Sequence, residues 1–352
     1  MDDENPATPP ASSPAPPIPP NAQMNQLLTS FWMTQAISVV TRLGVPEVLA
    51  DGARPVTEIA EEVGAHAPTL DRVLRGLTER GILTFHDDRY ALTPLGATLR
   101  RGTPGSLASL AIMLGSDWMV ALRGGLYESV RTGRMATVDV LGTGLFSYLE
   151  QHPEDAGIFD AAMVESSASA AAAMATAYDF SRFTTLVDVG GGRGYLLGSI
   201  LAAHPGLHGV LFDEAHVIAG AGPQLERHGV ADRCELTAGS FFETVPPGAD
   251  GYILSSVLHD WDDETALAIL RNVATAMTPE ATLLIAGWVL PDGPEPYPVG
   301  RVLDVQMLLV TDGGRERTQS EFDDLLNRAG LRLVKVLQGR PTLPTLLEVV
   351  RL

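Results

Sequence analysis

From residue 185 onward, short β-rich runs alternate with helical stretches, and this alternation constrains the fold more than any other feature. The seven runs are Thr185–Val189, Leu207–Phe212, Arg233–Leu236, Tyr252–Ser255, Thr282–Ala286, Leu331–Leu337 and Leu346–Val350. Because helical stretches separate the first five runs, these runs should form parallel strands joined by crossover helices. A short turn region, Gly339-Arg340-Pro341, joins the last two runs, which should pair antiparallel at one edge. The sequence therefore predicts an α/β fold with a doubly wound seven-stranded sheet.

The chain begins with a segment that should not fold. Residues 1–20 are rich in Pro, Ala and Ser and have no periodic apolar face, so we expect a disordered tail. From Met24 to Leu49 the pattern becomes helical, with a broad stripe of large apolar side chains. Such a stripe suits a helix that is buried on more than one side or against a second subunit. An ordinary core helix is the alternative.

Residues 21–105 should form a unit of their own. After the first helix, residues 55–64 and 68–80 read as two short helices, and residues 82–92 read as a β-hairpin. This order is similar to a winged helix, a fold that often binds DNA. Residues 106–180, which follow, are helical and rich in alanine.

The charge of the chain argues against a nucleic-acid partner. Lys+Arg 24 against Asp+Glu 43 gives a formal net charge of -19. A surface this acidic repels phosphate backbones and anionic membranes, so we expect neither nucleic acid nor membrane as a partner. A non-catalytic regulator that binds DNA through the winged-helix-like part is kept as an alternative.

Composition also bears on the cellular compartment and on metals. Cys234 is the single cysteine, so neither an intrachain disulfide nor a cysteine metal site is possible. The first residues, Met1 to Glu4, are acidic where a secretory signal would be basic, and no apolar run approaches the ~20 residues needed to span a bilayer. We therefore expect a cytoplasmic protein.

A glycine-rich loop follows the first predicted strand. It reads Asp188-Val189-Gly190-Gly191-Gly192-Arg193-Gly194 and precedes a helix, which is where such sheets bind a nucleotide-like ligand. Asp213 ends the second strand, where a carboxylate can accept hydrogen bonds from a ribose. The dinucleotide pattern Gly-x-Gly-x-x-Gly fails, because the third glycine falls on Tyr195 or Leu197. An NAD enzyme is therefore disfavoured.

Five motifs occur in the same order as in one known family. They are Asp188–Gly194, Leu211–Asp213, Gly239–Phe242, Leu258–Glu264 and Gly313–Thr318. In these motifs the chain resembles the caffeic-acid-type O-methyltransferases, and more closely the bacterial members that modify polyketides and other natural products. The resemblance covers nearly everything after the tail and implies a class I methyltransferase fold that acts as a homodimer on a small aromatic acceptor.

The same resemblance implies a domain organisation. The winged-helix-like part, 21–105, would serve dimerisation, and 106–180 would be a helical connector that contributes to the acceptor pocket. The cofactor-binding catalytic domain would span 181–352.

S-adenosylmethionine is the cofactor that the resemblance implies. Gly190 and Gly192 would lie against its amino-acid part, and Asp213 would hold the ribose hydroxyls. Ser255 would lie near the methionine end, although relatives often have Lys or Arg at that position. The remaining expected contacts come from the third motif: Gly239, Ser240 and Phe241, the last two flanking the adenine. Many relatives carry Asp at the position of Ser240, and a serine accepts a hydrogen bond more weakly than a carboxylate.

For catalysis, the resemblance implies His259 as a general base and Glu316 as the residue that orients it. His259 directly follows the fourth strand, at the edge where such sheets place their sites. A neutral imidazole can accept the proton of a phenol as its oxygen attacks. A second glutamate of the plant relatives falls at Gly287 and is lost here; Asp304 could substitute for it or merely anchor its helix.

Two further groups of residues require interpretation. The acids Asp260, Asp262, Asp263 and Glu264 are expected to cap a helix that begins near Asp263, and no metal site is expected. The candidates for the acceptor pocket are large apolar or acidic side chains: Trp118, Phe146, Phe159, Met163, Asp304, Met307 and Leu308.

Two alternatives to O-methylation by a histidine base stay open. Because one glutamate is lost, a relative with altered chemistry is possible, since some family members have become decarboxylases or hydroxylases. A metal-dependent catechol methyltransferase is the other, and it would lose activity in the presence of a chelator.

Overall fold

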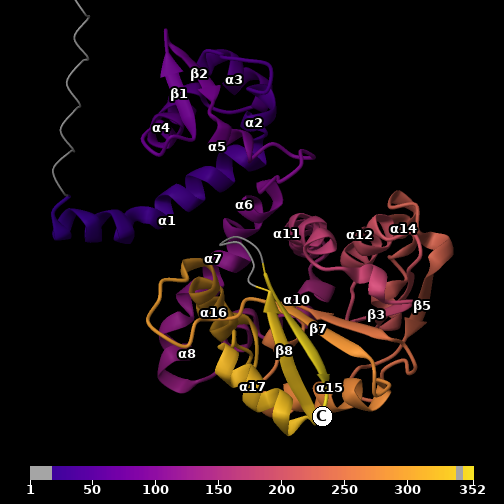
Figure 1. The fold of residues 1–352 in the computed structure, drawn as a ribbon. Coiled ribbons are helices and arrows are strands. Elements are labelled where there is room, and N and C mark those ends of the chain that lie inside the picture. The colour runs from indigo at the N-terminus through magenta and orange to yellow at the C-terminus, as the bar shows by residue number, and fades with distance from the viewer. Residues whose placement is uncertain (1–17, 338–343) are drawn as a thin grey trace, which may run out of the picture.

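The computed structural model describes residues 18–337 and 344–352. An N-terminal lobe, built from the first helices and a small hairpin, stands apart from a larger C-terminal lobe that contains the main sheet (Figure 1). Residues 1–17 of the predicted tail (1–20) and the predicted turn region around Gly339-Arg340-Pro341 lie outside the described residues. The predicted tail is one residue too long, because Pro20 already belongs to the first helix.

The N-terminal lobe contains the helices and the hairpin in the predicted order. Its elements are α1 (Pro20–Leu43), α2 (Val45–Val48), α3 (Val56–Val63), α4 (Ala67–Thr78), β1 (Leu83–His86), β2 (Arg89–Leu92) and α5 (Pro94–Ala97). The prediction of one helix up to Leu49 is wrong, because Gly44 adopts φ 86 and ends α1. Asp87 and Asp88 adopt φ 48 and 57, which suits the two-residue turn of the hairpin.

The first half of α1 is exposed, although its side chains are apolar. Leu27, Leu28, Phe31 and Trp32 are 68%, 67%, 50% and 60% exposed. The alternative of an ordinary core helix is therefore wrong for these residues. Monomers rarely leave such a contiguous apolar face in water, so the face fits contact with a second subunit.

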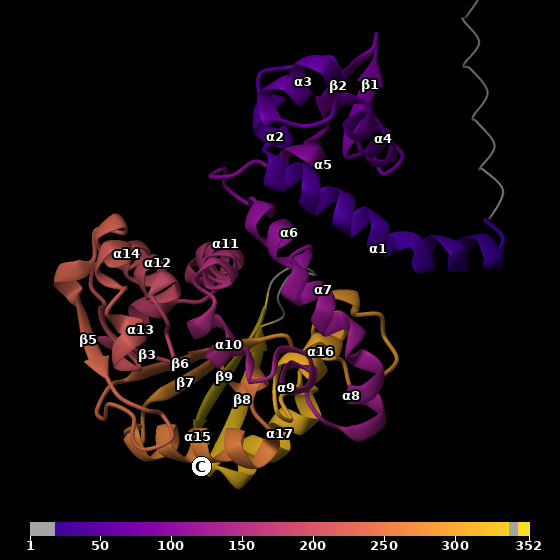
Figure 2. The same ribbon diagram turned by 180° about the vertical axis from the view of Figure 1, so that it is seen from behind.

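A helical region connects the two lobes (Figure 2). Its elements are α6 (Ala108–Leu114), α7 (Asp117–Gly124), α8 (Leu126–Thr132), α9 (Ala136–Leu141), α10 (Leu145–Gln151), α11 (Pro153–Ala177) and η1 (Phe180–Arg182). The long helix α11 packs against both α6 and the first helix of the sheet domain. The prediction that this region is helical is confirmed.

The main sheet has seven strands in the order β5-β4-β3-β6-β7-β9-β8. Their bounds are β3 (Thr185–Val189), β4 (His208–Asp213), β5 (Cys234–Ala238), β6 (Gly251–Ser255), β7 (Thr282–Gly287), β8 (Leu331–Leu337) and β9 (Thr345–Arg351). β3 to β7 are parallel, and β9 runs antiparallel to both of its neighbours. The predicted sheet and its antiparallel edge pair are confirmed; β5 starts one residue later than predicted and extends to Ala238.

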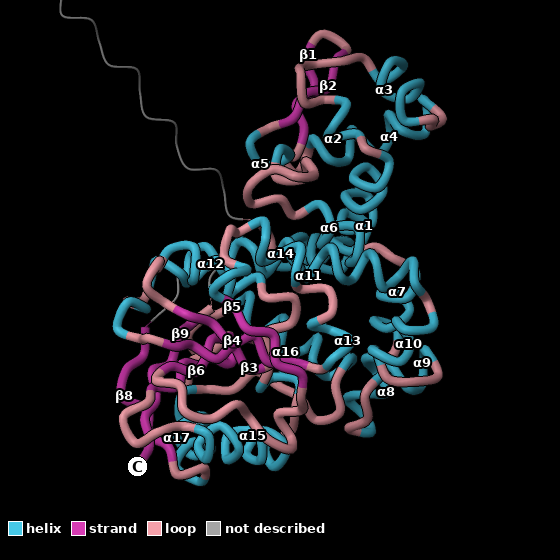
Figure 3. Tube along the Cα trace, turned by 90° about the vertical axis from the view of Figure 1, so that its right-hand side faces the viewer, coloured by secondary structure: helices cyan, strands magenta, loops and turns pink. Residues whose placement is uncertain are grey.

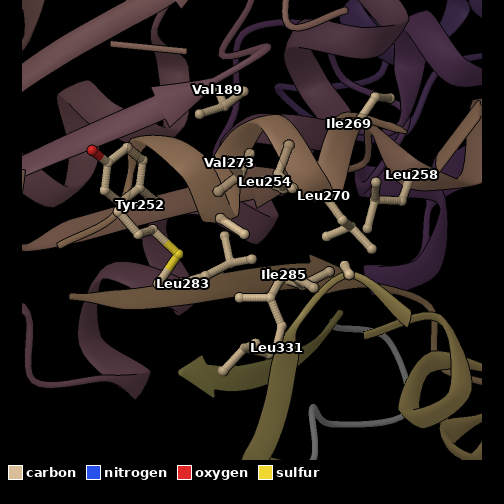
Figure 4. Packing of buried hydrophobic residues seen from close by; sticks show 14 of the residues in the cluster. Val189, Tyr252, Leu254, Leu258, Ile269, Leu270, Val273, Leu283, Ile285 and Leu331 are labelled. Carbon is tan, nitrogen blue, oxygen red and sulfur yellow. The ribbon is translucent and has the colours of Figure 1, made fainter. Parts of the chain in front are cut away.

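Helices cover both faces of this sheet (Figure 3). They are α12 (Tyr195–Ala203), α13 (Ala215–Ile218), α14 (Gly222–Arg227), α15 (Asp263–Ala276), α16 (Pro298–Val310) and α17 (Gln319–Arg328), with the short turns η2 (Ala231–Arg233) and η3 (Leu258–Asp260). On one face, side chains of α15 meet those of β6 and β7 in a dense apolar core (Figure 4). On the other face, α11, α12 and α14 bury a second cluster.

The strand order fixes where a ligand can bind. The chain runs outward from β3 to β4 and β5, and then returns to β6 on the other side of β3. At such a switch point the loops after the two central strands diverge and leave a crevice outside their carboxyl ends. The loops after β3 and β6 carry the glycine motif and His259.

Candidate active site

The glycine motif forms a tight loop between β3 and α12, which we call the cofactor loop (Gly190–Gly194). Gly190, Gly192 and Gly194 adopt φ 71, 59 and 77, values that residues with a side chain rarely reach. A methyl group added at Gly190 would lie 2.9 Å from Cγ2 of Val257 and 3.3 Å from the ring of Phe241. At Gly192 it would meet nothing within 4 Å, so the loop is open there.

Asp213 ends β4 and fixes the cofactor loop from the side. Its Oδ2 accepts a hydrogen bond of 2.8 Å from the backbone N–H of Gly192, and its Oδ1 accepts one of 2.7 Å from Glu214. A carboxylate has about four acceptor positions, so each oxygen keeps capacity for a ligand hydroxyl. Asp213, which the sequence predicts to bind a ribose, therefore lies against the predicted glycines of the cofactor loop.

Beneath the loop lies Asp188, a carboxyl group that is 1% exposed and whose oxygens make no hydrogen bond of ordinary length and angle among the described residues. Burial, together with the charge of Asp213, raises the pKa of Asp188 to about 7, although the backbone N–H of Leu197 has the opposite effect. Above this pH the ionised carboxylate therefore adds a negative charge beneath the cofactor loop.

The third motif follows β5 on the same side of the sheet. The backbone N–H of Gly239 donates to the carbonyl of Asp213 at 3.0 Å, which ties the motif to the end of β4. The side-chain oxygen of Ser240 accepts from the backbone of Phe242 at 3.3 Å. The Phe241 ring faces the glycine loop, as its distance to Gly190 shows. Ser255 ends β6 and is half-buried.

His259 lies in η3, directly after β6, and pairs with Glu316. The distance from its Nδ1 to Oε1 of Glu316 is 2.8 Å, and its Nε2 lies 3.6 Å from Oδ1 of Asp260. Burial lowers the pKa of His259, but the Glu316 hydrogen bond and the charges of Asp260 and Glu316 outweigh it, so the pKa lies above its ordinary value. Its side chain stays 22% exposed, so a ligand can reach it.

Asp304 acts on Glu316 rather than on His259. From α16, its Oδ1 accepts a hydrogen bond of 3.0 Å from the backbone N–H of Glu316. Of the two roles considered for Asp304, the structure shows an anchoring contact. Gly287 ends β7, and a methyl group added there would meet nothing within 4 Å, so the position where the plant relatives carry a glutamate is open.

The acidic cluster after His259 is used for helix capping and ion pairs. Asp262 caps α15, since its Oδ1 accepts from the backbone of Thr265 at 2.7 Å, a contact typically worth about 1 kcal/mol. Asp263 pairs with Arg315 and Arg317. Residues 18–337 and 344–352 contain no group of acids, histidines or cysteines that could hold a metal ion.

The acceptor-pocket candidates are only partly brought together. Phe146 and Phe159 meet edge to face, with ring centroids 6.4 Å apart, and Phe146 is largely exposed. Met163 and Leu308 are exposed as well. Trp118 and Met307 are instead buried, at 3% and 6% exposed, and Trp118 belongs to the apolar core of the helical region.

Two residues near the site, Asp188 and Arg317, have structural roles that the sequence does not indicate. In the sequence, Asp188 marks only the start of a glycine motif, and Arg317 is only one residue of the last motif. No sequence signal separates Arg317 from its neighbour Arg315, since both alternate with acidic and polar residues. Only burial, at 1% exposed for Arg317, distinguishes them.

Comparisons with known proteins agree with this geometry. Residues 124–332 match an O-methyltransferase domain, and residues 25–102 match an O-methyltransferase dimerisation domain. The second match supports a homodimer, and the exposed apolar face of α1 lies within the matched residues. It leaves the winged-helix description of that region a prediction. In the described part of the chain, no helix has the length and apolarity to cross a bilayer.

Individual relatives cover almost the whole chain. The phenazine O-methyltransferase of Lysobacter antibioticus is 42% identical over 321 residues, 91% of this chain and 93% of that protein. A hydroxylase, aclacinomycin 10-hydroxylase of Streptomyces purpurascens, is 33% identical over 345 residues, 95% of this chain and 92% of that protein.

A similar solved structure supports the assignment of the cofactor. It is an O-methyltransferase from neocarzinostatin biosynthesis in complex with S-adenosylmethionine and 2-hydroxy-5-methyl naphthoic acid. It matches with a TM-score of 0.74 at 33% identity, covering 91% of this chain and 96% of that one. The matched enzyme domain overrules a non-catalytic regulator as the main interpretation. The chain belongs to the O-methyltransferase family and is an S-adenosylmethionine-dependent O-methyltransferase of natural-product biosynthesis.

Proposed function

We propose that this enzyme methylates a phenolic hydroxyl of an aromatic natural product, with His259 as the general base. The observation that carries the proposal is the 2.8 Å contact between Nδ1 of His259 and Glu316, at the carboxyl edge of the sheet beside the cofactor loop.

The domain division at about residues 20, 105 and 180 belongs to the same proposal. So does the absence of a nucleic-acid partner, which a gel shift at low salt tests.

The residues of the cofactor loop fit S-adenosylmethionine. Gly190 leaves the backbone free for close approach, Asp213 offers acceptors to a diol, and the unpartnered carboxyl of Asp188 suits a cationic ligand. When bound, the cofactor supplies a methyl group on a positively charged sulfur, already activated for in-line displacement. Ser240 and Phe241 would flank its adenine, with Gly239 as a further contact, and Ser255 would lie near its methionine end.

His259 has the geometry of a general base whose ring is oriented by a hydrogen bond at Nδ1, the nitrogen that does not face the acceptor. With Nδ1–H donating to Glu316, the lone pair of Nε2 is left for the acceptor hydroxyl. Asp260, at 3.6 Å from Nε2, stabilises the imidazolium that forms when the proton arrives. Proton removal of this kind typically contributes about 10²–10⁴-fold to the rate. Alignment of the acceptor contributes up to roughly 7–11 kcal/mol.

The acceptor would bind between the helical region and α16. Phe146 and Met163 offer exposed apolar surface on one side, beside the half-buried Phe159, and Leu308 offers it on the other. We assign the buried Trp118 and Met307 to the wall behind this surface. Aromatic and thioether side chains suit a flat aromatic acceptor.

One experiment tests the cofactor site and a second tests the chemistry. Calorimetric titration with S-adenosylhomocysteine should show saturable binding that is weakened in Asp213→Ala. A labelled-methyl screen of hydroxyphenazines, hydroxyquinones and hydroxybenzoates should then show transfer that is lost in His259→Ala. Transfer that persists in His259→Ala would remove the general-base role.

The open position at Gly287, together with the hydroxylase relative, supports a second candidate function. In this alternative the enzyme keeps the cofactor but decarboxylates or hydroxylates its substrate. Mass analysis of products separates the two, because methylation adds a labelled methyl group and the alternatives do not. Full activity in the presence of a chelator would exclude a metal-dependent catechol methyltransferase.

A further inference from the structure

Arg317 is a charged side chain in the interior of the sheet domain. It is 1% exposed and follows Glu316 directly in the chain. A buried guanidinium is costly unless its donors are satisfied, so its partners report what holds it there. One of them is Asp263, whose Oδ1 lies 3.0 Å from Nε and 2.9 Å from Nη2.

The other two partners are backbone carbonyls on either side of His259. Nη1 of Arg317 donates to the carbonyl of Leu258 at 2.7 Å, and Nη2 donates to the carbonyl of Trp261 at 2.8 Å. Leu258 immediately precedes His259, and Trp261 follows it by two residues. The planar guanidinium thus spans η3 and fixes both of its ends.

The same stretch of chain, residues 313–318, touches His259 in two further ways. We call it the arginine segment. A methyl group added at Gly314 would lie 2.5 Å from the carbonyl oxygen of His259, so the two backbones are in direct contact. Glu316 holds the imidazole ring at Nδ1. The arginine segment therefore contacts the ring, the backbone and both flanks of His259.

We propose that Arg317 is a positioning residue for His259, holding η3 so that the imidazole stays against Glu316 while Nε2 faces the acceptor. The inference rests on the proposed role of His259 as the base. The guanidinium of Arg317 donates to Asp263 and to the carbonyls of Leu258 and Trp261, so it acts through the backbone around η3. Because a misplacement of about 1 Å can cost roughly 10²-fold in rate, this bracing matters for catalysis.

Arg315 provides a matched control. It belongs to the same segment and pairs with the same Asp263, at 2.9 Å, and with Glu321 at 2.8 Å. Its side chain is 40% exposed, and within the described part of the chain its hydrogen bonds go to these two carboxylates and not to the carbonyls of Leu258 or Trp261. Loss of Arg315 therefore removes an ion pair from the segment without removing the brace.

The charge of Arg317 gives a second readout. Among the groups around His259, Glu316 and Asp260 raise its pKa, whereas burial and the charge of Arg317 lower it. Removing the charge of Arg317 should therefore raise the pKa of His259 further. A lysine at position 317 would keep this charge, but its ammonium cannot reproduce the planar fork that spans two carbonyls and a carboxylate.

The test compares Arg317→Met, Arg317→Lys and Arg315→Met in the full-length homodimer. Histidine labelled with carbon-13 is titrated by NMR from about pH 5 to about pH 9, with the His259 signal assigned by its loss in His259→Asn. We expect Arg317→Met to shift this titration to higher pH, Arg317→Lys to leave it near the wild-type position, and Arg315→Met to leave it unchanged. Both Arg317 variants should lose the hydrogen-bonded Nδ1–H signal.

A kinetic measurement complements the titration. With a phenol that the enzyme methylates, kcat should fall about 10- to 100-fold in both Arg317 variants, while S-adenosylhomocysteine affinity stays within about threefold. If Arg317→Met does not fold, the Nδ1–H signal and kcat of Arg317→Lys decide the question. The NMR titration needs no acceptor, so failure to find a methylated phenol would leave this readout intact.

Two outcomes would overturn the proposal. One is an unchanged Nδ1–H signal and kcat in both folded Arg317 variants, together with an unchanged His259 titration in Arg317→Met. The other is an equal change in Arg315→Met, which would mean that any ion pair of the segment serves as well. A purely structural role would lower thermal stability in both Arg317 variants without moving the His259 signals of the folded protein.

Discussion

The two halves of the active site differ in how their buried charged groups are hydrogen-bonded. Beneath the cofactor loop, Asp188 is buried and neither of its oxygens makes a hydrogen bond of ordinary geometry. In the arginine segment, Glu316 and Arg317 are just as deeply buried, yet each is hydrogen-bonded to defined atoms of His259, η3 or Asp263. Both halves lie at the carboxyl edge of one sheet.

The difference shows which half is assembled before a ligand arrives. An unsatisfied buried carboxyl group destabilises the free protein, and it is relieved by a cationic ligand or by protonation. A satisfied network instead fixes geometry in advance. The cofactor half of the site therefore keeps an unsatisfied carboxyl group until a ligand binds. The hydrogen bonds of the catalytic half are already made within the chain.

His259→Ala should have the largest effect, because it removes the group that the arginine segment holds. We expect kcat for a phenolic acceptor to fall about 10²–10⁴-fold, while S-adenosylhomocysteine affinity stays unchanged. Calorimetry and labelled-methyl transfer measure the two quantities. His208→Ala, at the exposed start of β4, is the control and should behave as wild type. A loss of cofactor affinity in His259→Ala would mean that the two halves are not separable.

Asp213→Ala should affect the other half. Hydrogen bonds to a charged group contribute about 1.5–3 kcal/mol, so cofactor affinity should fall roughly 10- to 100-fold. Calorimetric titration with S-adenosylhomocysteine measures the change, and Asp232→Ala, at an exposed position of η2, serves as control. The NMR titration of His259 should stay as in wild type. Wild-type affinity in Asp213→Ala would contradict the assignment of the cofactor site.

Asp188→Asn should stabilise the cofactor-free protein in alkaline buffer. Since burial raises the pKa of Asp188 from 3.8 to about 7, the folded state binds the proton more tightly than the unfolded state. The stability that protonated Asp188 contributes to the folded state is therefore lost as the pH rises from 3.8 to about 7.

Asp188→Asn removes the ionised form, so Tm should rise by roughly 5 °C near pH 8 and change little near pH 5. Thermal unfolding at fixed protein concentration checks this, with the exposed Asp324→Asn as control. A lower Tm near pH 8 would show that Asp188 has a partner in the folded protein.

Gly287→Glu should have the smallest effect. It adds a negative charge to the catalytic half, where Glu316 already holds His259. The position is open, so the variant should fold normally. If the new carboxylate reaches His259 as the resemblance implies, it should raise the pKa of that imidazole, moving the acid limb of the rate profile to higher pH. We expect kcat at its optimum to change by no more than about threefold, because Glu316 already orients the ring. An unchanged pH profile would place the new carboxylate out of reach of His259.

The sequence was sufficient for the features that depend on local pattern. The alternation of strands and helices, the glycine loop and an aspartate cap for the helix that begins near Asp263 all follow from side-chain type and spacing. For the apolar stripe of α1, the sequence left open whether it faces the core or a second subunit. The break at Gly44 was missed, because the periodic apolar pattern continues across a glycine that adopts a left-handed conformation.

The acceptor region could be predicted least. Large apolar residues in an alanine-rich helical stretch give the same pattern whether they line a pocket or fill a core. Phe146 is largely exposed and Trp118 is buried, although both occur in similar sequence contexts. Their difference arises from helix packing between α7, α10 and α11, which no local spacing encodes.

The sequence by itself therefore determined the sheet, the cofactor motif and the identity of the candidate base, since each is encoded within a short stretch. Only the tertiary structure decided that Asp188 is left without a partner, that Asp304 holds Glu316, and that Arg317 rather than Arg315 braces η3. Those contacts join residues far apart in the chain. Their energies depend on burial, which is a property of the packed fold and not of residue type.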